Sequence, residues 1–582
     1  MSIINKRQKK NVKGRIYFLA FLFFLITGFI LSRLYFLQVL SYQTYHALAQ
    51  NQYQVFQELL PNRGKIFLKD KDKLYPLAIN REYKMVYLVP REIEDEDKVI
   101  FMLSSILNLK KETIKNKISD KNSFFKICKH RLNSDEIEKI KRAKLKGVHL
   151  MNENFRYYPG QQLASQVVGY VGNKGDKTQV GCYGLEAYWE KELKGKPGSL
   201  FQEKDAAGRW ISLSDRKIKK AENGVNLITT IERTIQYETE KVLQESIEKY
   251  QADKGTAIVV DVRTGKILAL ANFPNFNPNQ YNQVTDMKLF LNPAVSEAYE
   301  AGSVFKSITL AIGLDTKKIS PQTTYIDTGS VFKSGYTIKN SDEKSHGKQT
   351  MTEVLEKSLN TGSIFVEKLI GNKTFLEYLK DFGFGKKTGI ELPGELKGNL
   401  NNLNYLKRDI NFYTASFGQG IAITPLQLIM AYATLANHGK LMKPQIIDKI
   451  IYPNGKIEII QPEFRKQVIT DETSRLISEM LRKVVTNGHG KRADVAGYLV
   501  GGKTGTAQIA KKNDKGYKED AFIGTFVGYA PTNDPRFAVL VKIDNPKNVQ
   551  WAESSAAPTF SKIMEFVLKY YKVKPSLKYD KQ

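Results

Sequence analysis

The chain has 582 residues, and at about 150 residues per domain this length predicts three or four structural units rather than one core. With 42% hydrophobic and 26% charged residues, the composition is that of a folded protein and excludes a disordered one. The formal charge of +29 is spread along the sequence without a zinc-finger or other nucleic-acid signature, so it argues against nucleic acid and suits an anionic lipid surface.

The amino terminus predicts one membrane-spanning helix. Six basic residues precede an apolar run at 16–31, and the apolar character resumes after Arg33, which gives spanning length. Because positive flanks stay in the cytoplasm, we expect a cytoplasmic tail at 1–14, a transmembrane anchor at 15–40, and an extracytoplasmic remainder. A cleaved signal peptide is the alternative, but the Ala-x-Ala-like site at 47–49 lies too far along the chain.

The next segment, residues 41–224, predicts a non-catalytic pedestal domain. Short β-rich pieces such as 84–89 alternate with charged helical stretches such as 135–146, and no cluster of catalytic residue types occurs there. The two cysteines, Cys128 and Cys182, are too few for a metal cluster or a disulfide framework. They could pair or remain thiols, and for each the role of a small buried apolar residue is preferred.

A second module follows at 225–572, with a tail at 573–582. Strands at both ends with helices between them predict an α+β domain built on a mainly antiparallel sheet. The expected elements are a helix at 234–250, a hairpin at 255–261 and 266–271, helices up to about 383, strands at 498–510, 522–529 and 537–543, and a last helix at 557–571.

The candidate chemistry starts at Ser303 and Lys306, where a glycine before the serine opens a probable helix and the lysine follows one turn later. A neighbouring amine is one way to activate a serine, as in the S-x-x-K pattern. The pattern alone is weak, since three other Ser-x-x-Lys strings occur in this chain. Two further motifs follow in order, Ser358-Leu359-Asn360 and Lys503-Thr504-Gly505-Thr506, and the ordered set is specific.

A second Lys-Thr-Gly occurs at 387–389, directly after a glycine-rich turn at 382–385. We expect that copy to be structural. Lys503, in contrast, lies between Gly501-Gly502 and Gly505, where small residues let a substrate lie against the edge of a strand.

The ordered motifs resemble those of penicillin-binding transpeptidases and serine β-lactamases, and the flanking strings resemble the class B penicillin-binding proteins. Two positions depart from the family pattern, Ala301 in place of proline and 70–73 in place of Asp-Arg-Asn-Gly, and neither removes a reacting atom. The strings that carry the resemblance are 33–39, 63–66, 156–160, 184–186, 299–303, 417–421 and 424–428.

This resemblance implies a peptidoglycan D,D-transpeptidase in which Ser303 attacks the penultimate D-Ala of a stem peptide and forms an acyl-enzyme. Lys306 would be the general base, which requires lowering its pKa from about 10.4 to near 7 at about 4–5 kcal/mol. One positive charge at about 4 Å supplies roughly 4 kcal/mol at an effective dielectric near 20, and Lys503 is the expected source. Ser358 would relay a proton to the leaving amine, and Asn360 would orient Lys306 and bind the substrate amide.

The resemblance also implies the binding contacts. Thr504 and Thr506, on either side of Gly505, would hold the terminal carboxylate, and the backbone N–H groups of Ser303 and Thr506 would form the oxyanion hole. The reaction needs no cofactor and no metal, and no phosphate loop or ligand cluster occurs in the sequence.

The implied partners are peptidoglycan stem peptides, a lipid-linked precursor, β-lactams, the membrane, a polytopic glycosyltransferase and other cell-division proteins. The strings 541–547 and 556–560 look more like the septal branch than the elongation branch. A β-lactamase and a non-catalytic β-lactam sensor remain less favoured alternatives. His438 and His489 are expected to be loop residues, since no nucleophile-elbow motif surrounds Ser303.

Overall fold

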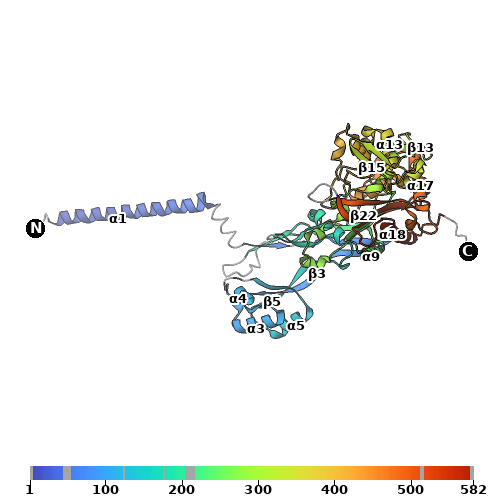
Figure 1. The fold of residues 1–582 in the computed structure, drawn as a ribbon. Helices are drawn as coiled ribbons and strands as arrows, with labels where there is room; N and C mark the ends of the chain where they lie inside the picture. Colours follow the sequence, from blue (N-terminus) through green and yellow to red (C-terminus); the bar gives the residue numbers. More distant parts are fainter. Residues whose placement is uncertain are drawn as a thin grey trace. The chain divides into compact units, whose positions relative to one another are not determined.

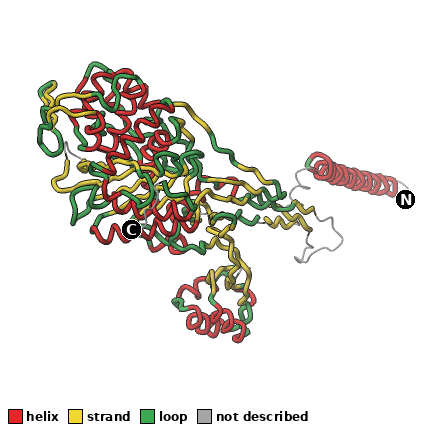
Figure 2. The backbone as a smooth tube through the Cα atoms, turned by 90° about the vertical axis from the view of Figure 1, so that its right-hand side faces the viewer, coloured by secondary structure: helices red, strands yellow, loops and turns green. Residues whose placement is uncertain are grey.

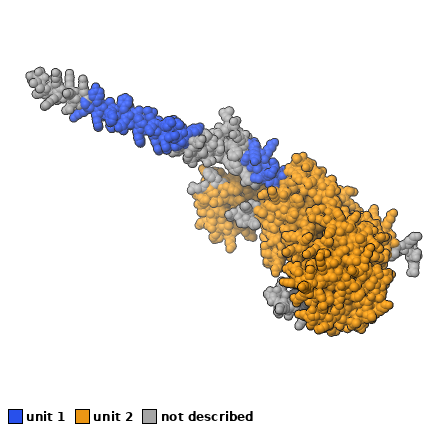
Figure 3. Space-filling model, turned by 90° about the horizontal axis from the view of Figure 1, so that it is seen from above, with its two compact units in different colours: residues 1–62, 195–223 blue, residues 63–194, 224–582 orange. Residues whose placement is uncertain are grey.

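The computed structural model describes residues 4–42, 54–59, 61–121, 123, 125–174, 177–203, 217–510 and 517–576. The chain divides into two compact units, which Figure 3 colours separately. Unit 1 comprises Met1–Asn62 and Gly195–Asn223, and unit 2 comprises Arg63–Lys194 and Gly224–Gln582. The predicted α+β class is confirmed.

Unit 1 contains the predicted apolar helix. Helix α1 runs from Ile4 to Tyr35 and continues as a π-helical turn, Phe36–Leu40. Its segment Gly14–Leu40 is apolar and long enough to cross a membrane, and none of its most apolar window is buried against protein. The same unit has an antiparallel sheet whose order is β1-β8-β9, formed by Gln54–Leu59, Gly198–Glu203 and Lys217–Lys219.

Unit 2 contains a seven-stranded sheet that joins distant parts of the sequence. Strand β10 lies between β2, which it meets in parallel, and β18, so segments near residues 66, 226 and 447 are neighbours. The sheet therefore contains strands from both sides of the predicted domain boundary between residues 224 and 225. The boundary itself stays a prediction. The strands are β2 (Ile66–Asp70), β3 (Lys73–Leu88), β4 (Lys126–Leu132), β5 (Val148–Tyr157), β10 (Asn226–Glu232), β18 (Ile447–Ile451) and β19 (Ile457–Ile459).

One end of this sheet carries a small helical layer, visible beside β3 and β5 in Figure 1. Val86 and Leu88 of β3 pack with Leu103 and Ile114 in a core of their own. Cys128 is buried there, and burial raises the pKa of its thiol to about 11. The helices are α3 (Glu96–Leu107), α4 (Lys111–Ile118) and α5 (Ser134–Ala143).

Three of the sequence strings that carry the resemblance meet at a buried carboxylate. Glu186 Oε2 accepts from Arg63 Nε (2.7 Å), and Glu186 Oε1 accepts from Arg156 Nε (2.6 Å). Burial alone would raise the pKa of Glu186, but the two guanidinium groups hold it below its usual value. Cys182 lies nearby in sequence and donates its thiol hydrogen to the Val180 carbonyl O (3.3 Å).

A second sheet of unit 2 has five antiparallel strands, ordered β12-β11-β23-β22-β21. Alternate residues of β11 enter opposite cores: Ile258 faces one helical layer and Val259 the other. Helices cover both faces of the sheet (Figure 2), and β21 is an edge strand. The strands are β11 (Lys254–Asp261), β12 (Ile267–Phe273), β21 (Gly501–Ala510), β22 (Tyr517–Ala530) and β23 (Phe537–Asp544).

Helices lie where they were predicted, between 234 and 383 and near the carboxyl end, whereas the three α-helices between 409 and 486 and the short strand pairs were not predicted. The 3-10 helix η5 is Gly302–Phe305, and the α-helices are α9 (Arg233–Tyr250), α11 (Lys306–Asp315), α12 (Met351–Glu356), α13 (Asn360–Ile370), α14 (Asn372–Asp381), α15 (Asp409–Ala415), α16 (Pro425–Ala436), α17 (Asp471–Thr486) and α18 (Ala556–Tyr570). The strand pairs are β13 (Thr324–Asp327) with β16 (Gly347–Thr350), β14 (Ser330–Lys333) with β15 (Tyr336–Lys339), and β17 (Lys440–Met442) with β20 (Phe464–Gln467). The remaining α-helices and β-strands of the described residues are α6 (Ser165–Val168), β6 (Val171–Lys174), β7 (Lys177–Gly181), α7 (Gly184–Tyr188), α8 (Glu190–Leu193) and α10 (Pro293–Ser296).

Candidate active site

Ser303 lies in η5, at the point where a 3-10 turn leads into α11. Two glycines make this position possible. Gly302 has a φ of +63°, and a Cβ on Gly418 would lie 2.4 Å from the Gly302 carbonyl O. The turn also presses on β21, because a Cβ on Gly505 would lie 2.8 Å from the Ala301 carbonyl O. The half-buried Ser303 is thus held directly beside the edge strand.

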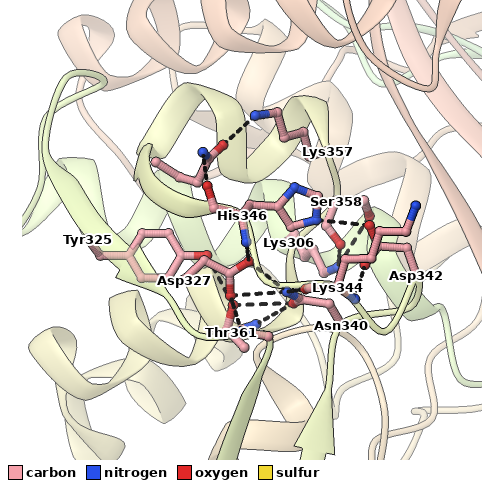
Figure 4. A network of polar contacts seen from close by, with 12 residues as sticks. Lys306, Tyr325, Asp327, Asn340, Asp342, Lys344, His346, Lys357, Ser358 and Thr361 are labelled. Atoms are coloured by element: carbon pink, nitrogen blue, oxygen red, sulfur yellow. Dashed lines mark hydrogen bonds and ion pairs between the residues drawn. The ribbon is translucent and has the colours of Figure 1, made fainter.

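Lys306 is completely buried at the start of α11. Its Nζ donates to the Ser358 carbonyl O (2.5 Å) and to Ser358 Oγ (3.2 Å), as Figure 4 shows. Burial, together with the positive charge of Lys503, holds the pKa of Lys306 well below its usual value. A neutral amine has two N–H bonds and one lone pair, so these two contacts leave the lone pair available as a base.

Ser303 and Lys306 are three residues apart on consecutive turns. In the part of the chain that the structure describes, no hydrogen bond joins Ser303 Oγ to Lys306 Nζ. Such contacts are often long in free enzymes and tighten when substrate binds.

Ser358 lies in the short connection between α12 and α13, with a φ of +57° that non-glycine residues seldom adopt. Asn360 begins α13, and its Nδ2 donates to the Lys339 carbonyl O (2.8 Å). Among the described hydrogen bonds, Lys306 therefore contacts Ser358 but not Asn360. The expectation that Asn360 orients Lys306 is not met by a direct contact.

Lys503 donates to the same hydroxyl. It is completely buried on β21, and its Nζ donates to Ser358 Oγ (3.0 Å) and to the Thr504 carbonyl O (3.1 Å). Burial lowers the pKa of Lys503 to about 7, while the Glu553 carboxylate acts in the opposite direction. The structure thus brings Lys306, Ser358 and Lys503 together, with Ser358 Oγ shared between the two amines.

Thr504, Gly505 and Thr506 continue along β21, which pairs with β22 on one side only. An edge strand can add an extended peptide through its free backbone groups. Thr506 Oγ1 accepts from the Ala552 N–H (3.2 Å), so the segment after β23 borders this strand. The sequence analysis missed Glu553 in that segment, because no local pattern there marks a charged group near the lysines.

The other Lys-Thr-Gly copy lies in an irregular segment directly after the turn at 382–385, outside any strand. Lys387 is exposed, and Gly389 has a φ of +80°. The Thr388 hydroxyl (2.6 Å) and N–H (2.5 Å) donate to Glu395 Oε1, and the Gly389 N–H (3.2 Å) donates to Oε2. The donors of this copy are occupied by a carboxylate of the same chain.

The two histidines expected to be loop residues lie in turns, His438 after α16 and His489 after α17. His438 pairs with Asp471, and His489 Nδ1 lies 3.4 Å from Glu553 Oε2. Among the described residues, no group of three His, Cys, Asp or Glu side chains is placed to hold a metal ion.

Comparison with known proteins gives matches along the whole chain. The family described as penicillin binding protein transpeptidase domain matches residues 255–565, and that described as penicillin-binding protein dimerisation domain matches residues 58–229. Stage V sporulation protein D of Bacillus subtilis is 33% identical, over 97% of this chain and 87% of that protein. The peptidoglycan D,D-transpeptidase FtsI of Buchnera aphidicola subsp. Baizongia pistaciae is 31% identical, over 98% of each chain. The crystal structure of penicillin binding protein 3 from Mycobacterium tuberculosis complexed with aztreonam has a TM-score of 0.69 at 26% identity, over 90% of this chain and 98% of that one.

Proposed function

Because the chain belongs to the class B penicillin-binding proteins, which cross-link peptidoglycan stem peptides through a serine acyl-enzyme, we propose that Ser303 is its nucleophile and Lys306 its general base. The observation that carries this proposal is the position of Ser358 Oγ, within hydrogen-bond distance of both Lys306 Nζ and Lys503 Nζ. The arrangement favours a neutral Lys306, since a second buried ammonium lies beside it.

In the first half-reaction, the Ser303 hydroxyl proton passes to the lone pair of Lys306 while Oγ attacks the carbonyl carbon of the penultimate D-Ala. The C–N bond breaks, and the terminal D-Ala leaves after its amine takes a proton relayed by Ser358. In the second half-reaction the amine of another stem peptide attacks the acyl-enzyme, loses a proton and restores Ser303. Atoms and charges balance without a cofactor.

The edge strand supplies the binding contacts of this proposal. Thr504 and Thr506 hold the terminal carboxylate near the Lys503 ammonium, and Gly505 lets the peptide lie close to the backbone. The N–H groups of Ser303 and Thr506 bind the oxyanion. Asn360 acts on the substrate amide rather than on Lys306, consistent with its contact to the Lys339 carbonyl O.

The test is covalent labelling of the full-length protein with a fluorescent penicillin. Ser303→Ala should abolish labelling, and persistent labelling would overturn the assignment of the nucleophile. Lys306→Arg keeps the charge but cannot act as a base, so the acylation rate should fall by about 10²–10⁴-fold. A near-normal rate in that variant would show that Lys306 serves only as a positive charge.

A cross-linking assay on lipid-linked precursor then separates transfer from the alternatives. A transpeptidase forms dimeric stem peptides, whereas a β-lactamase releases hydrolysed penicillin and a sensor stays acylated without forming product. We propose the septal branch over the elongation branch, with a polytopic glycosyltransferase and other cell-division proteins as partners. Localisation of a fluorescent fusion to the septum or to the side wall of growing cells decides between the branches.

We also propose that the apolar helix is an uncleaved single-pass anchor, with residues 1–14 in the cytoplasm and 15–40 in the membrane. The pedestal at 41–224, the transpeptidase domain at 225–572 and the tail at 573–582 would then be extracytoplasmic. Deleting residues before Ser41 should give a soluble protein that still reacts with penicillin. Protease protection of the amino terminus in intact cells tests the orientation.

A further inference from the structure

A buried polar network lies directly behind the turn that carries Ser358 and Asn360 (Figure 4). Its centre is Asp327, the last residue of β13, which is 1% exposed. Asp327 Oδ1 accepts from Thr361 Oγ1 (2.7 Å), and both carboxylate oxygens accept from Asn340 Nδ2 (3.1 and 2.9 Å). The backbone N–H groups of Gly329 and His346 also donate to this carboxylate, each at 3.0 Å.

Every described donor to Asp327 is neutral. In the described part of the chain, no cationic side chain lies within ion-pair distance of its carboxylate. A buried carboxylate held only by neutral donors is costly to desolvate, and it needs several well-placed hydrogen bonds. An amide at this position would turn an acceptor into a donor that faces other donors. The network therefore specifies a carboxylate at position 327.

The network holds the first turn of α13. This helix begins at Asn360 without a side-chain cap, so its first N–H groups need outside partners. The Thr361 N–H donates to Asn340 Oδ1 (3.2 Å), while the Thr361 hydroxyl donates to Asp327. A carboxylate near a helix amino terminus is also favoured by the helix dipole.

The same network fixes the strand on which Asn360 rests. Asn340 follows directly after β15, and Asp327 holds its side chain. Its neighbour Lys339 provides the carbonyl O that accepts from Asn360 Nδ2. Asp327 thus supports the Ser358-Asn360 turn from two sides, through Thr361 and through the end of β15.

We propose that Asp327 is a positioning residue, which fixes the turn that places Ser358 Oγ between Lys306 and Lys503. Ser358 needs this support because its φ of +57° lies in the left-handed region, which is unfavourable for a non-glycine residue. Without Asp327 the turn relaxes and the shared hydroxyl moves away from the amines. This inference rests on the catalytic roles proposed for Ser358, Lys306 and Lys503.

The experiment measures the rate constant of acylation by a fluorescent penicillin, on the full-length protein, in a double-mutant cycle. Asp327→Asn should slow acylation about ten-fold or more in the otherwise intact protein. In a Ser358→Ala background, where the positioned hydroxyl is gone, the same change should cost less than about three-fold. Equal losses in the two backgrounds would overturn the inference. The rate constant describes only the molecules that become labelled. A variant with a smaller folded fraction therefore gives less labelled protein but not a lower rate constant.

A second pair of variants covers the case in which Asp327→Asn does not fold. Thr361→Val removes one donor at constant shape and should slow acylation, whereas Thr361→Ser keeps the hydroxyl and should restore the rate. Equal rates for the two would contradict the inference. The matched control is Asp342→Asn, an exposed carboxylate of the same loop that accepts from the Lys344 N–H (3.2 Å) and from the His346 ring, and it should have no effect.

The outcomes separate this inference from the proposed function. If the unaltered protein is not labelled, or if Ser303→Ala is still labelled, the proposed function fails. If labelling depends on Ser303 but Asp327→Asn reacts at the unaltered rate, only the assignment of Asp327 fails.

Discussion

The two Lys-Thr-Gly segments of this chain have the same residues and opposite surroundings. Lys503 is the third residue of strand β21, completely buried, and its amine donates to Ser358 Oγ. Lys387 is exposed in the irregular segment after a turn, and the donors that follow it bind Glu395. The copy at 387–389 holds a carboxylate of its own chain, and we propose that the strand copy holds a carboxylate of another molecule.

The comparison shows that the motif is a set of donors rather than a site. At 387–389, a glutamate eight residues after Lys387 occupies its backbone and hydroxyl donors. Strand β21 is adjacent to the turn that carries Ser303, so under the proposed function a carboxylate bound there would place the rest of a peptide over the proposed nucleophile.

Removing each of the two lysines in turn should give the largest difference between the two copies. Lys503→Ala should slow penicillin acylation about 10²–10³-fold, because the substrate loses a charge and Lys306 loses the neighbour that keeps it neutral. Lys387→Ala should stay within about two-fold, as expected for an exposed side chain. The measurement is the acylation rate constant of both full-length variants. Similar losses would mean that the wrong copy has been assigned to the active site.

Removing the hydroxyl of the threonine in each copy is a smaller change with a smaller expected effect. Thr504→Val should lower acylation about 10-fold or more, since a hydrogen bond to a charged group contributes about 1.5–3 kcal/mol. Thr388→Val should leave acylation unchanged and instead lower the free energy of unfolding, because its hydroxyl bonds Glu395 within the fold. Acylation rates and urea unfolding of both variants are compared. A loss of acylation in Thr388→Val would contradict the division of roles.

Glu395→Gln tests the occupied copy alone. The carboxylate accepts three hydrogen bonds, and one amide cannot replace both acceptor oxygens, so the free energy of unfolding should fall by about 1–3 kcal/mol. Glu565→Gln, on the exposed face of α18, is the control and should stay within about 0.5 kcal/mol. Slower acylation by folded Glu395→Gln would show that the segment at 387–389 affects the reaction of Ser303.

The pH dependence should show the smallest effect. The pKa of Lys503 is about 7, so below that pH it is an ammonium that can hold a carboxylate, and above it the charge is lost. Acylation should therefore decline as the pH rises through this range. Glu553→Gln removes the carboxylate that raises the pKa of Lys503, so the alkaline limb should move to lower pH. Acylation rates measured from pH 5 to 10 locate the alkaline decline. If Glu553→Gln left this decline at the same pH or moved it to higher pH, Glu553 would be excluded as the group that raises the pKa of Lys503.

Local patterns predicted the order of elements well. The hairpin of β11 and β12, the three carboxyl-terminal strands and helix α18 are where alternation and helical periodicity placed them. The convergence of Lys306, Ser358 and Lys503 also followed from motif order, because the resemblance supplied a fold in which these segments meet. Residue types alone would not have separated Lys503 from Lys387.

The sequence could not predict features that depend on contacts between distant segments. Strands β13 to β16 are four residues long, too short for a periodic signal, so Asp327 and Asn340 had no visible role. The parallel pairing of β10 with β2 joins residues about 160 positions apart, which no local pattern encodes. Glu553 lies between β23 and α18, and its electrostatic effect on Lys503 could not be predicted for the same reason.

The shared Ser358 hydroxyl has a consequence for the direction in which protons can travel. A hydroxyl oxygen has two lone pairs and one hydrogen. Here one lone pair faces Lys306 Nζ and the other faces Lys503 Nζ, so the hydrogen must point in a third direction, away from both amines. A proton taken up from either lysine is therefore matched by release of the hydrogen on the far side. The geometry therefore suits Ser358 to pass protons between the two amines and a group on the far side of its hydroxyl.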